Sequence, residues 1–245
     1  MERSNTEHRR RVEEGLGLRK AAIGPFFSLF VLFITLFVLY PFARTEVVGI
    51  GVIDVLGTAI FVATIYAVSR RRRDLIIAIA LAGPGLAANW ATYLFPSVRL
   101  AMFGHACYAA FFAMTAAAIL AAVFRTRRTT LDTLMGGVCA YFLLGMIWSY
   151  VFCLLELWHA GSFASAIGPV ALQAGGPGLS DESDLIYFSF CTLTTLGYGD
   201  IVAVARPARS MAALEAVIGQ LYLAVLLTRL VALHIVHSGR AQAEA

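Results

Sequence analysis

Long uncharged stretches constrain this sequence more than any other feature. Residues 21–43, 75–98, 100–124 and 133–155 carry no charge, residues 47–69 carry only Asp54, and residues 210–237 carry Glu215 and Arg229. A helix needs about 20 mostly apolar residues to cross the hydrocarbon core of a bilayer. Charged residues make up only 14% of the chain, against roughly 25% in soluble domains. The sequence therefore predicts an all-α integral membrane protein with six transmembrane helices.

The basic residues divide unevenly between the two sets of loops. Fourteen Lys and Arg residues lie in residues 1–20, 70–73, 125–128 and at Arg240, and four lie in the alternate loops. Loops rich in Lys and Arg stay on the cytoplasmic side. We therefore expect both termini in the cytoplasm, at the plasma or inner membrane. Since the basic clusters flank apolar runs, the net charge of +4 indicates contact with membrane lipid rather than nucleic acid.

The region between the fifth and sixth predicted spans contains two further uncharged pieces. Residues 157–180 are rich in Gly, Ala, Ser and Pro, which favours a loop. Residues 185–199 are apolar but too short to cross the membrane, as is typical of a re-entrant segment. Polar and acidic residues before it predict a helix from about Asp184 to about Thr194. Its C-terminal end, which carries partial negative charge, would point into the membrane.

Two glycines alternate with bulky residues directly after this helix, in the sequence TLGYGD. We call these residues, 195–200, the filter segment. Glycine permits backbone conformations that are closed to other residues, so successive carbonyl groups can face one way. Non-helical backbone at this depth persists only where it lines a cavity or is buried in protein. A row of carbonyl oxygens there can replace the water shell of a cation.

TTLGYGD, between two spans and after a short helix, resembles the tetrameric potassium channel family. The resemblance covers residues 129–238. It implies a selectivity filter whose oxygens bind K⁺ and are supplied by Thr195, Leu196, Gly197 and Tyr198. It implies an outer mouth shaped by Gly199 and Asp200, with support for the filter from Thr194 and Glu156. One pore loop per chain implies a homotetramer with cyclic symmetry, with K⁺ as the transported ion and no cofactor.

Four positions bear on how far the resemblance extends. Leu196 stands where many members have Val, and Tyr187 and Phe188 stand where they have a pair of Trp. The sequence therefore leaves open what holds Tyr198 from behind. Gly219, 19 residues after Asp200, stands where members place a glycine at which the inner helix bends. A packing role is the alternative, because glycine is common at contacts between membrane helices.

A leucine face follows Gly219 in the last span. Helical spacing places Leu223, Leu226 or Leu227, and Leu230 on one side. Four copies of this face around an axis would form an apolar constriction that closes by dewetting. The same face could instead pack against the fifth span, and one helix does not distinguish the two. Leu223, Leu227 and Leu230 are thus candidate gate residues.

The chain divides into four predicted parts. These are a cytoplasmic tail (residues 1–20), a four-helix membrane domain of unknown input (21–128), a pore domain (129–238) and a second tail (239–245). A voltage sensor would carry Arg at every third position of the fourth span, but residues 100–124 contain none. We therefore expect no voltage sensing, and we expect His105 to be a buried polar residue of that span.

Three further sets of polar residues suggest additional roles. Asp54 is an ionisable group inside a span, which raises a functional hypothesis; a capped or hydrogen-bonded residue near the outer third of the helix is the alternative. His234 and His237 share one helix face, where they could bind a proton or a metal or could serve as polar residues at the membrane interface. Residues 156–215 contain six acidic and two basic residues, which predicts a negative field that concentrates cations at the pore entrance.

Three rival functions differ in what they require. A weakly selective cation pore is disfavoured by the complete GYG, and a potassium-uptake transporter would carry four degenerate pore loops in one chain. A non-conducting membrane scaffold or an enzyme would need a polar constellation elsewhere in the membrane, and the predicted spans offer only Asp54 and scattered His residues for it. The sequence favours a K⁺-selective channel that is neither an enzyme nor voltage-gated.

Overall fold

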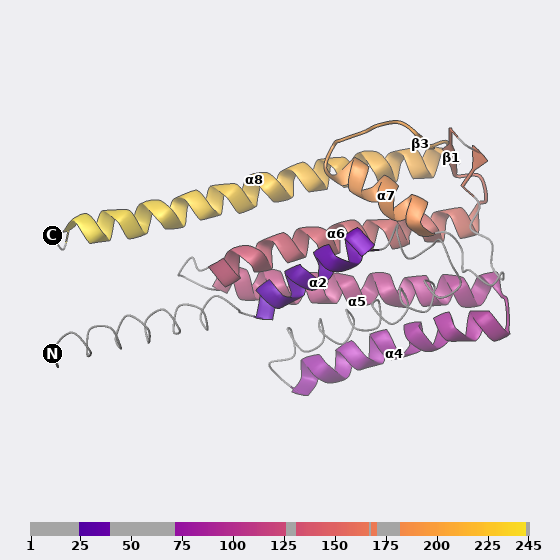
Figure 1. The fold of residues 1–245 in the computed structure, drawn as a ribbon, viewed down its shortest axis with the longest axis horizontal. Coiled ribbons are helices and arrows are strands. Elements are labelled where there is room, and N and C mark those ends of the chain that lie inside the picture. The colour runs from indigo at the N-terminus through magenta and orange to yellow at the C-terminus, as the bar shows by residue number, and fades with distance from the viewer. Residues whose placement is uncertain (1–24, 40–71, 126–130, 167, 171–181, 244–245) are drawn as a thin grey trace, which may run out of the picture.

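The structure is a computed structural model that describes residues 25–39, 72–125, 131–166, 168–170 and 182–243 (Figure 1). Its helices are α2 (Pro25–Leu39), α4 (Arg72–Leu94), α5 (Val98–Arg125), α6 (Leu131–Trp158), α7 (Glu182–Leu193) and α8 (Arg206–Ala243). Its strands are β1 (Phe163–Ser165), β2 (Gly168–Pro169) and β3 (Ile201–Ala203). The predicted helical fold is confirmed for the described residues, with the addition of this small sheet.

Five of the six predicted spans coincide with α2, α4, α5, α6 and α8. Three described segments are long and apolar enough to cross a membrane: Val98–Arg125, Asp132–Trp158 and Arg206–Arg229. Phe26–Thr35 and Ile76–Thr92 form shorter apolar helices. The predicted span at residues 47–69, with Asp54, lies outside the described residues, so the count of six stays a prediction.

Small residues let α4 and α5 approach closely. A methyl group added at Gly85 of α4 would lie 2.9 Å from the ring of Tyr108 on α5, and one at Gly104 of α5 would lie 3.5 Å from Ala88 on α4. Small side chains at such contacts allow helix backbones to pack tightly in lipid. α5 packs in turn against α6, which also contacts α2. Figure 1 shows α4, α5 and α6 side by side, with α8 extending past them towards the C-terminus.

α7 packs between α6 and α8. Its Phe188 meets Phe152 of α6 and Phe163 of β1, with all three ring centroids 5.2–5.4 Å apart in edge-to-face arrangements. Such pairs add to the stabilisation from burial alone. This triad fixes the side of α7 that packs against α6 and β1.

The sheet joins the end of α6 to the residues that follow the filter segment. Its order is β2-β1-β3, with Ala164 opposite both Pro169 and Val202. The amide of Ala166 donates to the Asp200 carbonyl at 2.8 Å, which fixes the exit of the filter segment. The predicted loop over residues 157–180 is therefore wrong where β1 and β2 form, because β1 takes its main partner from β3, a segment distant in the sequence.

Candidate functional site

The filter segment begins where α7 ends in a left-handed turn. The amide of Leu196 donates to the Cys191 carbonyl at 2.8 Å, and that of Thr195 donates to the Thr192 carbonyl at 3.0 Å. These two bonds form a Schellman motif, in which the residue after the helix takes positive φ and the last carbonyls find donors. Thr195 occupies that position, with φ 58°. The predicted helix of about Asp184 to Thr194 is thus close to the observed Glu182–Leu193.

Positive φ recurs at every second residue of the filter segment. Thr195, Gly197 and Gly199 have φ of 58°, 57° and 77°, whereas Leu196 and Tyr198 between them are not in this region. Glycine adopts such angles without steric cost. The backbone alternation on which the predicted carbonyl row depends is present.

Thr195 is the exception in this pattern because it is β-branched. A β-branched residue at positive φ is a true outlier, and strain of this kind costs on the order of 1–3 kcal/mol. Its hydroxyl donates to the Thr194 carbonyl at 2.6 Å and accepts from Nε2 of Gln220 at 3.3 Å. The side chain therefore ties the inner end of the filter segment to α8.

The last carbonyl of α7 is enclosed by α6 and α8. The Tyr141 hydroxyl donates to the Leu193 carbonyl oxygen at 3.0 Å. A methyl group added at Gly219 would lie 2.5 Å from that same oxygen. Gly219 therefore lets α8 pack directly on the end of α7, which is the packing alternative of the sequence analysis; the bend at Gly219 stays a prediction.

Tyr187 and Asp200 lie close together beside the filter segment. The Tyr187 hydroxyl is within electrostatic range of Asp200 and Cys191. Together with Phe188 and Tyr198 these residues surround a cavity of about 30 Å³. Tyr187 and Phe188 thus stand beside the filter segment, and Phe188 is held in the aromatic triad.

Glu156 and Thr194 act on backbone groups near the filter segment. The Glu156 carboxylate is buried and accepts from the amides of Gly161 at 2.7 Å and Phe163 at 3.1 Å. It therefore fixes the start of β1, whose pairing with β3 holds the filter exit. The Thr194 hydroxyl donates to the Phe190 carbonyl within α7 at 2.7 Å. The Glu156 side chain can thus act on the filter segment through the sheet, whereas the Thr194 carbonyl accepts directly from the Thr195 hydroxyl at 2.6 Å. Support of the filter by these two residues stays a prediction.

Glu215 of α8 is completely buried against α7. Its Oε1 lies 2.6 Å from the Ser189 hydroxyl, which lies 2.8 Å from the Gly145 carbonyl of α6. Burying a charged carboxylate is costly unless it is paired. A protonated Glu215 that donates to Ser189, while Ser189 donates to Gly145, satisfies both contacts. This chain of hydrogen bonds joins three helices.

We expect Glu215→Gln to preserve the fold and Glu215→Ala to destabilise it. Gln keeps the volume and a donor for Ser189, whereas Ala removes the hydrogen bond and leaves a cavity. Losses of this type cost about 2–4 kcal/mol. Thermal unfolding of the purified protein should show a lower midpoint for Glu215→Ala and a near wild-type midpoint for Glu215→Gln. Equal loss in both variants would contradict the neutral hydrogen-bonded Glu215.

Burial changes which acids can contribute to the predicted negative field at the pore entrance. Glu156 and Glu215 are 3% and 0% exposed, so neither presents its carboxylate to solvent. Glu182 pairs with His105, and Asp181 lies outside the described residues. Asp200 is exposed, and the field itself stays a prediction.

The leucines of α8 do not share one environment. Leu226 is buried, and its side chain occupies the space that a methyl group on Gly137 of α6 would need. Leu227 is exposed, and Leu223 is half-buried. Leu226 is therefore a packing residue, while Leu227 stays available for a constriction; the structure does not describe the side chain of Leu230.

The structure describes the side chain of only one of the three histidines named in the sequence analysis. His105 is buried, as predicted, whereas the structure does not describe the side chains of His234 and His237. Among the described residues, no group of three or more His, Cys, Asp and Glu could hold a metal ion.

Sequence reasoning missed the helix contacts that hold the filter segment. Tyr141 of α6 donates to the last carbonyl of α7, and Gln220 of α8 donates to Thr195 of the filter segment. The positions of both residues in the sequence carry no local signal of these contacts. Glu215 does carry a local signal, because an acidic residue inside an apolar span needs a partner. Its partner Ser189 could not be identified without knowing how α7 faces α8.

Residues 136–234 match the family model described as "Ion channel". The matched segment runs from α6 through α7 and the filter segment into α8, so it contains the site described above. No curated protein and no solved structure matches the chain. The match supports ion-channel function in an integral membrane protein and suggests transport rather than catalysis.

Proposed function

We propose that this protein is a K⁺-selective channel whose ions pass along the backbone oxygens of the filter segment. The observation that carries the proposal is the alternation of positive φ at Thr195, Gly197 and Gly199 in the sequence TLGYG. Such alternation directs carbonyl groups of successive residues to one side, where they can replace the water shell of K⁺. Thr195, Leu196, Gly197 and Tyr198 supply these oxygens, and Gly199 and Asp200 form the outer mouth.

The exposure of the single chain supports a homotetramer. Leu196 and Tyr198 are 54% and 70% exposed, although non-helical backbone within a membrane persists only next to protein or a cavity. An apolar stripe on α8 is also exposed and comprises Leu214, Val217, Leu221 and Val225. Copies of the same chain around a central axis would cover these surfaces and close the ring of carbonyls.

α8 lines the inner half of the ion pathway. In the tetramer, Leu223, Leu227 and Leu230 line an apolar constriction, and a bend at Gly219 opens it. The exposed position of Leu227 supports this arrangement. α2, α4 and α5 belong to the domain that receives an input and passes it to the pore.

We expect conduction to depend little on voltage. Residues 100–124 of α5 carry no Arg or Lys, and each elementary charge that crosses the field contributes about 2.3 kcal/mol per 100 mV. Single-channel recordings in planar bilayers should give an open probability that is nearly flat with voltage. A steep curve, equivalent to several charges per subunit, would refute a channel without a voltage sensor.

Flux from liposomes tests the proposal. Purified full-length protein should release K⁺ from loaded liposomes, and replacing K⁺ by Rb⁺ should maintain the flux. Comparable release of Na⁺ would favour a weakly selective cation pore. Absence of flux for every cation would refute channel function in favour of a membrane scaffold.

A further inference from the structure

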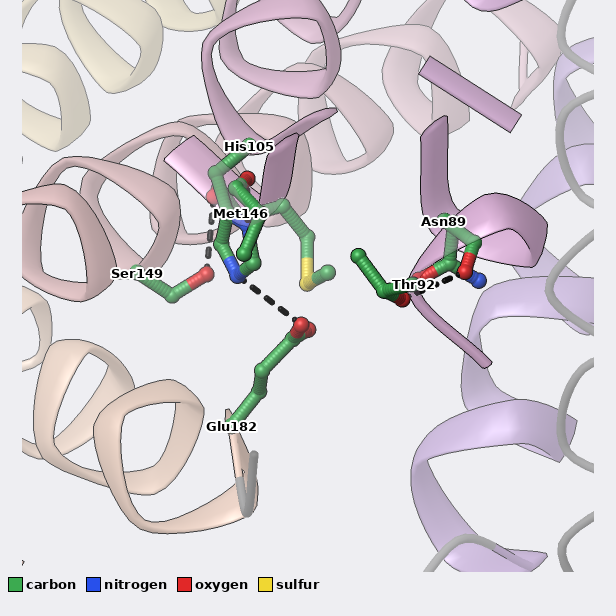
Figure 2. Close-up of polar contacts among 7 residues, drawn as sticks. Asn89, Thr92, His105, Met146, Ser149 and Glu182 are labelled. Atoms are coloured by element: carbon green, nitrogen blue, oxygen red, sulfur yellow. Dashed lines mark hydrogen bonds and ion pairs between the residues drawn. The ribbon is translucent and has the colours of Figure 1, made fainter. Parts of the chain in front are cut away.

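A polar contact joins α5 to the first residue of α7 (Figure 2). Nε2 of His105 lies 2.9 Å from Oε1 of Glu182, and His105 is 5% exposed. α5 packs against α4 and α6, whereas α7 packs against α6 and α8. The pair therefore connects two helices that are otherwise held together mainly through α6. One belongs to the input domain, and the other leads into the filter segment.

The hydrogen bonds of His105 show which ring nitrogens carry protons. Nδ1 lies 2.6 Å from the Ala101 carbonyl oxygen, which only accepts, so Nδ1 must carry a hydrogen. In a neutral imidazole, Nε2 then has a lone pair and no hydrogen. That lone pair would face an ionised Glu182 across 2.9 Å. Because two acceptors repel at this distance, the contact requires one more proton, on Nε2 or on the carboxyl group.

The uncharged neighbours of the pair do not supply this proton. From α4 come Asn89 and Thr92, and the Thr92 hydroxyl donates to the Asn89 carbonyl at 2.6 Å (Figure 2). From α6 comes Ser149, whose hydroxyl donates to the Met146 carbonyl at 2.8 Å. Both hydroxyl groups are thus directed to backbone oxygens.

The titratable neighbours differ in distance from the pair. From α6, the Tyr150 ring lies edge-on to His105 with centroids 5.6 Å apart, and Cys153 lies within electrostatic range of Glu182. Farther along the same helices stand Arg99 on α5, Glu156 on α6 and Asp184 on α7. Arg99 is exposed and the Glu156 carboxylate is held by backbone amides. The additional proton is therefore assigned to the pair of His105 and Glu182, whose Nε2 and Oε1 atoms are in ion-pair contact.

We infer that His105 and Glu182 form a proton-binding site through which the helices before the pore domain control conduction. This inference rests on the proposed function. With the proton bound, the pair holds the start of α7 against α5. Without it, the two acceptors repel, and the start of α7 loses its contact with α5. Since the other end of α7 carries the filter segment, K⁺ conduction should fall as pH rises.

The test uses full-length protein in liposomes with equal pH inside and outside. Between about pH 5 and 9, a range that brackets imidazole titration, we expect K⁺ flux to fall by about fivefold or more. Glu182→Gln should keep high flux and lose the pH dependence, because its amide donates to a neutral Nε2 without any further proton. His159→Gln is the matched control, since this exposed histidine at the end of α6 should leave the pH dependence intact.

NMR of the imidazole nitrogens provides a readout that does not depend on conduction. The Nε2 resonance of His105, assigned through His105→Gln, should report a proton on or hydrogen-bonded to Nε2 where flux is high, and a free lone pair after the pair loses its proton over the same pH interval. A His105 Nε2 resonance that does not change with pH, or a Glu182→Gln variant with wild-type pH dependence, would overturn the inference. If the wild type conducts at no pH, the proposed function fails, and the NMR titration alone decides the proton site.

Discussion

Replacing Gly197 with alanine is expected to abolish selective K⁺ conduction while leaving membrane insertion intact. Gly197 has φ 57°, and within the described residues a methyl group there meets no atom within 4 Å. The effect therefore comes from backbone strain, which costs about 1–2 kcal/mol for an L-residue in this region. In each of four copies around one axis, alanine would favour a φ angle other than the one observed at Gly197. The carbonyl row would then be misaligned. Flux of K⁺ and the yield of inserted protein should be measured on the same preparation.

Gly161→Ala is the matched control for this variant. Gly161 has φ 83° and, among the described residues, also no atom within 4 Å of an added methyl group. It lies in the turn between α6 and β1, outside the filter segment. The two variants should lose similar stability, but Gly161→Ala should retain K⁺ flux. Normal selective flux from Gly197→Ala would contradict the assignment of the filter.

Gly219→Ala is expected to separate α8 from α7 and to disrupt the pore. The added methyl group would lie 2.5 Å from the Leu193 carbonyl oxygen and 2.9 Å from the Leu193 side chain. The carbonyl belongs to the backbone of α7 and cannot rotate away, so one of the helices must shift. Overpacking of this kind costs about 1–3 kcal/mol per site. We expect a lower thermal unfolding midpoint together with loss of K⁺ flux.

Gly83→Ala controls for the general effect of removing a helical glycine. Gly83 lies within α4, where no described atom lies within 4 Å of an added methyl group. Alanine favours helix more than glycine does, but a Cβ before Pro84 is disfavoured in helical backbone. We therefore expect K⁺ flux to be retained, with at most a small change in the unfolding midpoint. A Gly219→Ala protein with unchanged unfolding and flux would show that α8 does not pack on α7 as described.

The parts of the fold that depend on local composition could be predicted from the sequence. Uninterrupted apolar runs specify α5 and α6 because a helix in lipid must satisfy its own backbone hydrogen bonds. The helix α7 and the glycines at positions 197 and 199 followed from capping residues and from the conformational freedom of glycine. Each of these features is determined within a few residues of the chain.

Features that depend on which helices meet could not be predicted in this way. The sheet requires β1 to pair with β3, and the packing of Gly219 against Leu193 requires the rotation of α8. The pairing of His105 with Glu182 joins residues far apart in the sequence, and neither residue alone identifies the other. The exposure of the acidic residues could not be predicted either. The sequence suggests that Glu215 is a charge at the pore entrance, but packing against α7 buries it.

The selectivity of the conducting pathway is the most direct test of the central claim. Reversal potentials of purified wild-type protein in planar bilayers should be measured with K⁺ on one side and Na⁺ on the other. A row of backbone oxygens in the filter segment predicts a reversal potential close to the K⁺ equilibrium value, with Rb⁺ able to replace K⁺. A reversal potential near zero, which means comparable permeability for K⁺ and Na⁺, would contradict the assignment of a K⁺-selective channel.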